Sequence, residues 1–402
     1  MQLREWNARL HGLVVFRALL GDPVVAKLAA LTDRLEAADD TIAPLCDAVA
    51  AFEAALFAHT TNLGDYLSNA VLETETFCVR QAAAGQLSPV MEAALNSELN
   101  FLQKLCGLTL DALLEAADRQ NRELAFLPRW EARQLDLTAA YNQRMREAGK
   151  KGYGMFAKHH VFTVENGQLV PVKYPDPQKL SELPGYEKER EKVIANTRAL
   201  LAGSPANNVL LYGDAGTGKS STVKAIANEY AADGLRLVEV KKNQLYQIPD
   251  LMDALASNPL KFILFIDDLS FTANDDNFAA LKAILEGSVG GRAGNIAVYA
   301  TSNRRHLIKE TLTDREGYDI HESDTRQELM SLSARFGLTI TFGSPDRERY
   351  LHIVEELAKQ YGVELDPRQL AVRSEAFAVR SGGRSARVAK QFIELCKAGV
   401  FS

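Results

Sequence analysis

The sequence predicts an α/β core between two helical regions. Five apolar segments alternate with helical patterns after about residue 180, namely NNVLLYG, LRLVEVK, KFILFIDD, NIAVYATSN and LTITFG. Near-continuous apolar strands of this kind are typical of a parallel sheet covered on both faces by helices. Apolar residues three and four positions apart dominate residues 1–148 and return after residue 343. We therefore expect a parallel five-stranded sheet, an all-α N-terminal domain and a helical C-terminal lid.

These patterns divide the 402 residues into four segments. They are a helical N-terminal domain at 1–148, a linker with a β-hairpin at 149–179, an α/β core at 180–343 and a helical lid at 344–402. Asn166 and Gly167 predict the turn of the hairpin. Ser344 is expected to cap the first lid helix, with Pro345 at its first helical position.

Charge and composition restrict the class of partner. The formal net charge is −6, and residues 1–150 carry 14 Lys and Arg against 20 Asp and Glu, whereas the rest balances at 32 against 32. Nucleic-acid binding would therefore need a local basic patch rather than a global field. One stretch mixes basic and aromatic residues, as a nucleic-acid-binding patch does, although a solvated linker can have the same composition. Its residues are Lys150, Lys151, Tyr153, Phe156, Lys158, His159 and His160.

The remaining composition favours a cytoplasmic protein. No apolar run is long enough to span a membrane, and the N-terminal residues lack the pattern of a secretory signal. The four cysteines form no CxxC pair, so we expect reduced thiols.

Residues 213–220, GDAGTGKS, fit the phosphate-loop pattern G-x-x-x-x-G-K-[ST] between an expected strand and an expected helix. Glycines let backbone N–H groups turn toward phosphate oxygens, and the helix N-terminus adds its positive end. Lys219 is expected to neutralise the β- and γ-phosphates, and Ser220 to ligate Mg²⁺. The expected nucleotide-binding residues are Gly213, Asp214, Ala215, Gly216, Thr217, Gly218, Lys219, Ser220 and Ser221.

Carboxylates and an amide follow the next apolar strands. Asp267 and Asp268 end FILFIDD, and Asn303 ends YATSN. Beside a phosphate loop, Asp267 is suited to the Mg²⁺ shell and Asp268 to polarising the attacking water. Asn303 is suited to holding that water or the γ-phosphate, although an Asn after a strand is also a common turn former.

Three arginines are candidates for contacts to the nucleotide. Arg335 precedes the last expected strand, where it can reach a γ-phosphate held by a neighbouring subunit. Arg384 and Arg387 lie three residues apart near the start of a lid helix and share a face. A surface ion pair is the competing interpretation for Arg335. Of Arg384 and Arg387, one is expected to contact the nucleotide and the other to be an ordinary surface or interface charge.

Taken in order, GDAGTGKS, FILFIDD, YATSN, SARFGL and GGRSARVAK resemble the AAA+ ATPases over roughly residues 180–402. Closest in appearance is a bacterial AAA+ family of predicted ATPases of unknown function. The resemblance implies Walker A at 213–220, Walker B at Asp267 and Asp268, sensor 1 at Asn303, an arginine finger at Arg335, and sensor 2 at Arg387 with Arg384 as the alternative. It also implies ATP and Mg²⁺ as cofactors.

The resemblance implies a Mg²⁺-dependent ATPase that remodels a macromolecular partner or controls its assembly. A nucleotide-gated binding switch is the first alternative. A nucleic-acid protein similar to helicase loaders is the second, because LFIDDLSF is similar to the Walker B region of replication initiators and helicase loaders. The superfamily further implies a homo-oligomer, a hexameric ring or spiral. The client stays unidentified, and the helical N-terminal domain is expected to select it.

Overall fold

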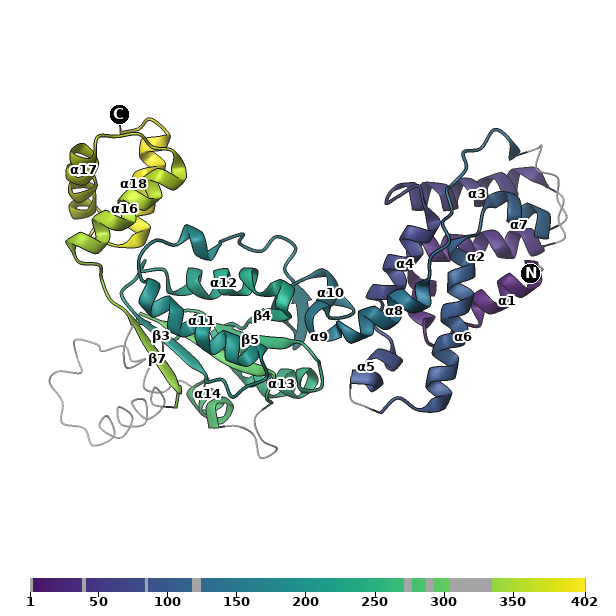
Figure 1. Cartoon of the computed structure of the whole chain (residues 1–402), viewed down its shortest axis with the longest axis horizontal. Coiled ribbons are helices and arrows are strands. Elements are labelled where there is room, and N and C mark those ends of the chain that lie inside the picture. The colour runs from purple at the N-terminus through teal and green to yellow at the C-terminus, as the bar shows by residue number, and fades with distance from the viewer. Residues whose placement is uncertain are drawn as a thin grey trace. The chain divides into compact units, whose positions relative to one another are not determined.

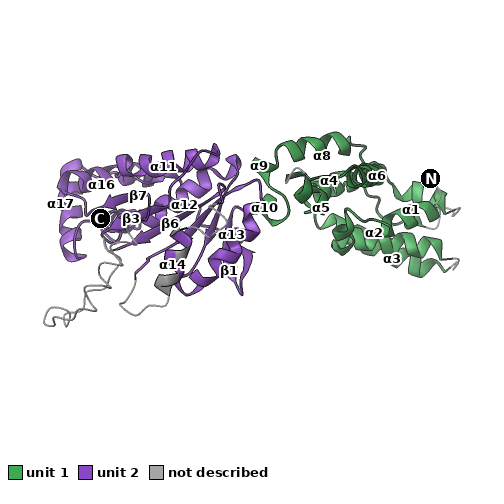
Figure 2. Cartoon of the chain, turned by 90° about the horizontal axis from the view of Figure 1, so that it is seen from below, with its two compact units in different colours: residues 1–158 green, residues 159–402 purple. Residues whose placement is uncertain are grey.

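The computed structural model describes residues 3–37, 41–83, 86–117, 124–270, 277–286, 293–303 and 335–401. The chain divides into two compact units, residues 1–158 and 159–402, which Figure 2 shows in different colours. Each unit has its own hydrophobic core. Residues 149–158 therefore belong to the first unit, and the hairpin that follows them belongs to the second.

The first unit is built from helices, as its apolar spacing predicts. Its helices are α1 (Leu3–His11), η1 (Arg17–Gly21), α2 (Pro23–Glu36), α3 (Ile42–Phe57), α4 (Leu63–Glu73), α5 (Phe77–Ala83), α6 (Pro89–Cys106), α7 (Leu110–Ala116), α8 (Leu137–Arg146), α9 (Ala148–Lys151) and α10 (Met155–Lys158). Side-chain caps fix the starts of several of them: the Asp22 side chain, for example, accepts hydrogen bonds from the Val24 and Val25 N–H groups at the start of α2. Among the helices of the described residues, none combines the length and apolarity needed to cross a bilayer.

The second unit alternates strands and helices and ends in a helical lid. Its elements are β1 (Val161–Glu165), β2 (Gln168–Pro171), η3 (Leu180–Glu182), α11 (Glu187–Leu201), β3 (Val209–Gly213), α12 (Lys219–Glu229), η4 (Ala231–Asp233), β4 (Leu235–Glu239), η5 (Lys242–Gln247), α13 (Ile248–Ala256), β5 (Lys261–Ile266), α14 (Asn277–Glu286), β6 (Ile296–Ser302), β7 (Leu338–Phe342), α16 (Arg347–Tyr361), α17 (Pro367–Arg380) and α18 (Ala386–Lys397). Figure 1 shows α11 and α12 on one side of the sheet and α13 and α14 on the other.

The strand order of the sheet is β2-β1-β4-β5-β6-β3-β7. Strands β3 to β7 are parallel to their neighbours, so the predicted five-stranded parallel core is confirmed. Strand β3 lies between β6 and β7, and β5 lies between β4 and β6. All parallel strands end at one edge of the sheet, so the residues that follow β3, β5 and β6 meet there.

The sheet is larger than predicted because the hairpin joins it. Strands β1 and β2 are antiparallel to each other, and β1 pairs in parallel with β4, with Val161 opposite Leu237. The predicted turn is present: Asn166 and Gly167 have φ values of 50° and 77°, as a two-residue hairpin turn requires. The hairpin covers the edge that β4 would otherwise expose, because Phe162 and Val164 are buried beside it.

The start of the lid differs from the prediction. The first lid helix, α16, is capped by Asp346, whose side chain accepts a hydrogen bond from the Arg349 N–H. Ser344 is therefore not its N-cap. It lies two residues earlier, in the segment 343–346 that connects β7 to α16 and that we call the hinge.

Candidate functional site

The phosphate loop connects the end of β3 to the start of α12. Gly213, Gly216 and Gly218 have φ values of 136°, 75° and 92°, which residues with a Cβ rarely adopt. At Gly213 the chain is also crowded, since a Cβ there would lie 2.1 Å from the Phe342 carbonyl oxygen. The glycines therefore allow both the turn of the loop and the close approach of β3 and β7.

Lys219 is buried inside this loop, with 6% of its surface exposed. Its Nζ donates to the carbonyl oxygens of Gly213 at 2.8 Å and Asp214 at 2.7 Å, and to Asn303 Oδ1 at 3.0 Å. Burial lowers the pKa of the ammonium group, and the nearby carboxylates oppose that shift. The cation is thus held at the centre of the loop, where phosphate oxygens can replace its present partners.

Ser220 and Asp267 bring two oxygen ligands together. The Ser220 hydroxyl donates a 2.6 Å hydrogen bond to Asp267 Oδ1. The same carboxylate oxygen accepts a hydrogen bond from the Thr301 hydroxyl. Oxygen donors of this kind, beside a phosphate site, fit Mg²⁺. Thr301 was not among the predicted site residues, although its place two positions before Asn303 in YATSN is a usable signal.

Asp268 is held next to Asn303. The Asn303 side-chain amide donates a 2.8 Å hydrogen bond to Asp268 Oδ1, and the Asp268 N–H donates to the Thr301 hydroxyl at 2.9 Å. Asp268 has a φ of 52°, an uncommon value for a residue with a side chain. Lys219, Asn303 and Asp268 therefore form one hydrogen-bonded chain across the ends of β3, β5 and β6.

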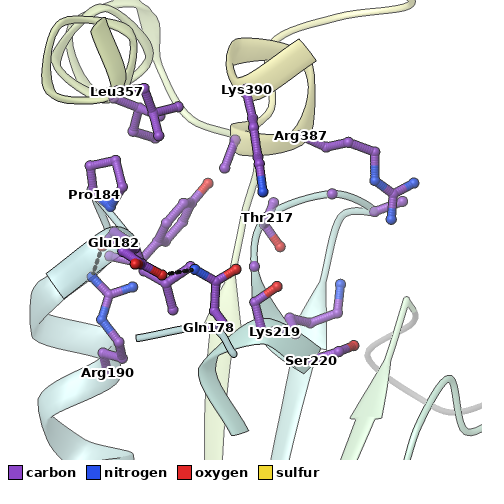
Figure 3. A pocket seen from close by; sticks show the side chains of 18 of the residues that line it. Gln178, Glu182, Pro184, Arg190, Thr217, Lys219, Ser220, Leu357, Arg387 and Lys390 are labelled. Carbon is purple, nitrogen blue, oxygen red and sulfur yellow. Dashed lines mark hydrogen bonds between the residues drawn. The ribbon is translucent and has the colours of Figure 1, made fainter. Parts of the chain in front are cut away.

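These groups line one wall of a pocket of about 800 Å³. Figure 3 shows this pocket between the phosphate loop, the residues before α11 and the lid. The predicted residues that line it are Ala215, Gly216, Thr217, Gly218, Lys219, Ser220, Ser221, Asp267, Asp268, Asn303 and Arg387.

The opposite end of the pocket was not predicted. It is formed by a mixed apolar and polar set from the segment before α11, from α11 and from α16: Gln178, Glu182, Leu183, Pro184, Tyr186, Arg190, Ile353, Leu357, Gln360 and Tyr361. Arg190 is buried and donates to the carbonyl oxygens of Leu183 at 2.5 Å and Gly185 at 2.7 Å, which fixes the loop before α11. The residues at this end of the pocket share no sequence motif, so the sequence pattern did not predict them.

The two candidate lid arginines, Arg384 and Arg387, have different surroundings. Arg387 lines the pocket, and its N–H donates to the Gly216 carbonyl oxygen at 3.0 Å. Arg384 is absent from the lining and instead holds Glu375 through two nitrogens, at 3.1 and 2.7 Å. Lys390, one turn beyond Arg387, also lines the pocket, and Figure 3 shows its side chain directed toward Thr217. Lys390 was not predicted.

Gly213 and Asp214 do not line the pocket. The Asp214 carboxylate faces the hinge, where one oxygen accepts hydrogen bonds from the Ser344 N–H and hydroxyl, both at 2.7 Å. These two bonds lower the pKa of Asp214. In this structure the side chain of Asp214 thus contacts the hinge.

Arg335 lies at the other edge of the sheet from the phosphate loop. It precedes β7, whose first residue, Leu338, donates its N–H to the Asn208 carbonyl at the start of β3. The loop follows the far end of β3, five residues along the strand. Arg335 does not line the pocket of its own chain.

The basic and aromatic stretch before the hairpin does not present its rings to solvent. Tyr153 and Phe156 are 4% and 6% exposed, so their faces are not available for stacking on bases. Lys158 pairs with Glu73 at 2.9 Å within the first unit. The aromatic part of the predicted nucleic-acid patch is therefore structural.

Comparisons with known proteins identify a family and more distant relatives. The family described as "Protein of unknown function (DUF815)" matches residues 156–400. The ATP-dependent zinc metalloprotease FtsH 2 of Symbiobacterium thermophilum is 27% identical over 253 residues, which cover 58% of this chain and 39% of that protein. The chain thus spans well under half of the length of that relative.

Solved structures of Thermotoga maritima RuvB are also similar. One RuvB variant is 19% identical with a TM-score of 0.37, covering 54% of this chain and 63% of the other. The structure titled as the RuvB Holliday junction branch migration motor is 17% identical with a TM-score of 0.33, covering 55% and 72%. The features of this chain that support an AAA+ P-loop core are its parallel sheet and the phosphate loop between β3 and α12.

Proposed function

The chain belongs to the DUF815 family of proteins of unknown function, and we propose that it is a Mg²⁺-dependent ATPase. One observation carries the proposal. Lys219, Ser220, Asp267, Asp268 and Asn303 come from three strand ends and form a connected set of contacts along one pocket. A cation in a glycine-rich loop, two oxygen ligands and a second carboxylate are the groups that phosphoryl transfer to water requires.

The residues suggest a division of roles. Lys219 and the loop N–H groups would hold the phosphates, and Ser220 with Asp267 would hold Mg²⁺, which supplies charge neutralisation at the transferred phosphoryl group. Asp268 would orient the attacking water as a general base. Asn303 already contacts both Lys219 and Asp268, so it is placed to sense what lies between them.

Phosphate release from ATP tests this activity. We expect ATP turnover that needs Mg²⁺ and stops when EDTA is added. Titration calorimetry should also show that ADP binds at the same site. A protein that binds neither ATP nor ADP in the presence of Mg²⁺ would refute the proposal.

A nucleotide-gated switch is the second candidate, and the Asn303–Asp268 hydrogen bond favours it. The bond occupies an oxygen of the carboxylate that must orient water, so hydrolysis would wait until Asn303 turns away. The distinguishing measurement is single turnover: a switch binds ATP tightly and releases one phosphate per site slowly, whereas a motor turns over steadily.

We further propose that the ATPase remodels a macromolecular client or controls its assembly, and that it acts as a homo-oligomer. The names of the relatives motivate the remodelling role, since one is an ATP-dependent protease and another a branch migration motor. The position of Arg335 outside the pocket of its own chain motivates the homo-oligomer. The first unit, with its excess of acidic residues, is the candidate client-binding part. Affinity capture with the Asp268→Asn variant in ATP, analysed by mass spectrometry, would identify what it holds. Capture of nothing beyond the wild-type control in ADP would count against a nucleotide-controlled client.

A further inference from the structure

We infer that Asp214 is a positioning residue: it holds the hinge so that the lid stays docked on the phosphate loop. The inference rests on the proposed nucleotide site. The position of Asp214 in GDAGTGKS suggests a role at the phosphates, but the Asp214 carboxylate faces Ser344. Asp214 would thus act on the nucleotide only through the lid.

The contact between Asp214 and Ser344 uses both donors of one residue. The Ser344 N–H and hydroxyl each lie 2.7 Å from Asp214 Oδ2. The Asp214 N–H in turn donates to the Phe342 carbonyl at 3.1 Å, at the end of β7. Asp214 therefore binds the chain on both sides of Gly343, where the core ends and the hinge begins. Hydrogen bonds to a charged acceptor are stronger than neutral ones.

A second residue holds the hinge from the other wall of the pocket. The Tyr186 hydroxyl donates to the Gly343 carbonyl at 2.7 Å, and its ring stacks on Phe342. Tyr186 precedes α11 and lines the pocket. The hinge is thus fixed between the phosphate loop and the loop before α11, which are two of the core segments that line the pocket.

The lid meets the phosphate loop at one more point, which reports on docking. The Arg387 N–H donates to the Gly216 carbonyl at 3.0 Å. Arg387 is in the first turn of α18, where an N–H has no partner within its own helix. Protection of this amide from hydrogen exchange therefore measures docking of the lid and not the stability of α18.

The first test needs no nucleotide. Hydrogen exchange of the Arg387 amide is measured in the wild type, Asp214→Ala, Ser344→Ala and the double variant. We expect roughly three- to tenfold faster exchange in Asp214→Ala, the scale of one or two exposed charge-assisted hydrogen bonds. Amides in the middle of α18, such as Phe392, should not change. Ser344→Ala keeps its N–H and should have the smaller effect.

Coupling between the two residues is the decisive result. Once Asp214 is Ala, Ser344→Ala should add nothing, and Ser344→Thr alone should behave as the wild type because it keeps both donors. Asp233→Ala, an exposed carboxylate in η4, is the matched control. Unchanged Arg387 exchange in Asp214→Ala, or independent effects of the two substitutions, would overturn the inference.

The second test follows dissociation of a fluorescent ADP analogue. Asp214→Ala should release it faster by a similar factor, with Ser344→Thr again unchanged. If the wild type binds no nucleotide, the proposed function fails, but the exchange experiment still decides whether Asp214 positions the lid. If nucleotide binds but Asp214→Ala changes neither the Arg387 exchange rate nor the dissociation rate of the ADP analogue, only the positioning role is wrong.

Discussion

The side-chain amide of Asn303 donates a 2.8 Å hydrogen bond to Oδ1 of Asp268. The oxygen of the same amide accepts from the Lys219 ammonium at 3.0 Å. One residue at the end of β6 therefore connects the cation of the phosphate loop to the second carboxylate after β5. If phosphate oxygens became the partners of Lys219, as the proposed function requires, Asn303 would lose one of its two contacts and the restraint on Asp268 would change with it. Under that proposal, nucleotide binding and water activation would be linked through this amide.

Substitution of the two aspartates should separate their roles. Asp268→Asn should still bind ATP but hydrolyse it at least roughly tenfold more slowly, because an amide is a poor general base. Asp267→Asn should shift the Mg²⁺ dependence to higher concentration, since Asp267 contacts Ser220 at the expected metal position. Phosphate release at graded Mg²⁺ measures both. Wild-type turnover in Asp268→Asn would mean that this carboxylate only ends the strand.

Lys219→Ala should abolish nucleotide binding. The ammonium is the buried cation at the centre of the loop, where the proposal places the β- and γ-phosphates. Titration calorimetry with ATP and ADP measures the loss. Lys192→Ala, on the exposed side of α11, is the matched control and should bind normally. Retained affinity in Lys219→Ala would place the phosphates elsewhere.

The lid cations should differ in their effects. Arg387→Ala and Lys390→Ala should each weaken nucleotide affinity by roughly three- to tenfold, because both side chains line the pocket. Arg384→Ala should leave affinity near the wild-type value, since its guanidinium is bound to Glu375 within the lid. Lys359→Ala, an exposed lid lysine paired with Glu356, serves as the control. A loss with Arg384→Ala alone would make that residue sensor 2.

Glu53 should make the first unit less stable as the pH rises. Its side chain is 2% exposed, and neither carboxylate oxygen has a hydrogen-bond partner among the described residues. Burial raises its pKa, opposed by Arg129. The folded state therefore holds the proton more tightly than the unfolded state, so stability falls as pH increases from the ordinary value of 4.5 through the raised pKa.

Glu53→Gln removes this titration and should therefore raise the free energy of unfolding more at pH 7 than at pH 4.5. Urea unfolding followed by tryptophan fluorescence reports the first unit selectively, because both tryptophans, Trp6 and Trp130, lie there. Glu115→Gln, on the exposed side of α7, is the control. Equal gains at both pH values would show that charge is not the cause.

Sequence alone could predict the parts of the site that follow strands. Parallel strands end at one edge, so Lys219, Asp267 and Asn303 had to meet once the strands were recognised. The far end of the pocket could not be predicted, because Pro184 and Leu357 reach it through tertiary packing without a spacing pattern. Ser344 shows a similar limit: its local sequence suits a helix cap, yet Asp346 caps α16 and Ser344 binds Asp214.

The hairpin shows how an isolated pattern becomes part of a sheet. Asn166 and Gly167 predict the turn from local backbone preference. Nothing local says that β1 pairs with β4, since that pairing depends on the exposed edge of a strand more than 70 residues away. The turn was therefore predictable from the sequence, and the seven-stranded sheet was not.

Arg335 lies before β7, at the edge of the sheet opposite the phosphate loop, and does not line the pocket of its own chain. Any contact with a γ-phosphate must therefore be made to another copy of the chain, in a head-to-tail ring or spiral. Arg335→Ala should bind ATP normally, lose most hydrolysis and associate less in ATP, because one charge-assisted pair across the interface is lost.

Mixing variants tests whether the site is shared. Arg335→Ala and Lys219→Ala subunits together should regain part of the activity, since one interface can join an intact phosphate loop to an intact arginine. The specific ATPase rate should also rise with protein concentration, and light scattering should show a larger mass in ATP than in ADP. Arg347 is an exposed lid arginine, and Arg347→Ala is the control. This variant should hydrolyse ATP without the addition of a second variant. A protein that is monomeric in both nucleotides, has a rate independent of concentration and shows no complementation would have its active site within a single chain. Arg335 would then have no role in hydrolysis, because it lies at the far edge of the sheet from the phosphate loop of its own chain.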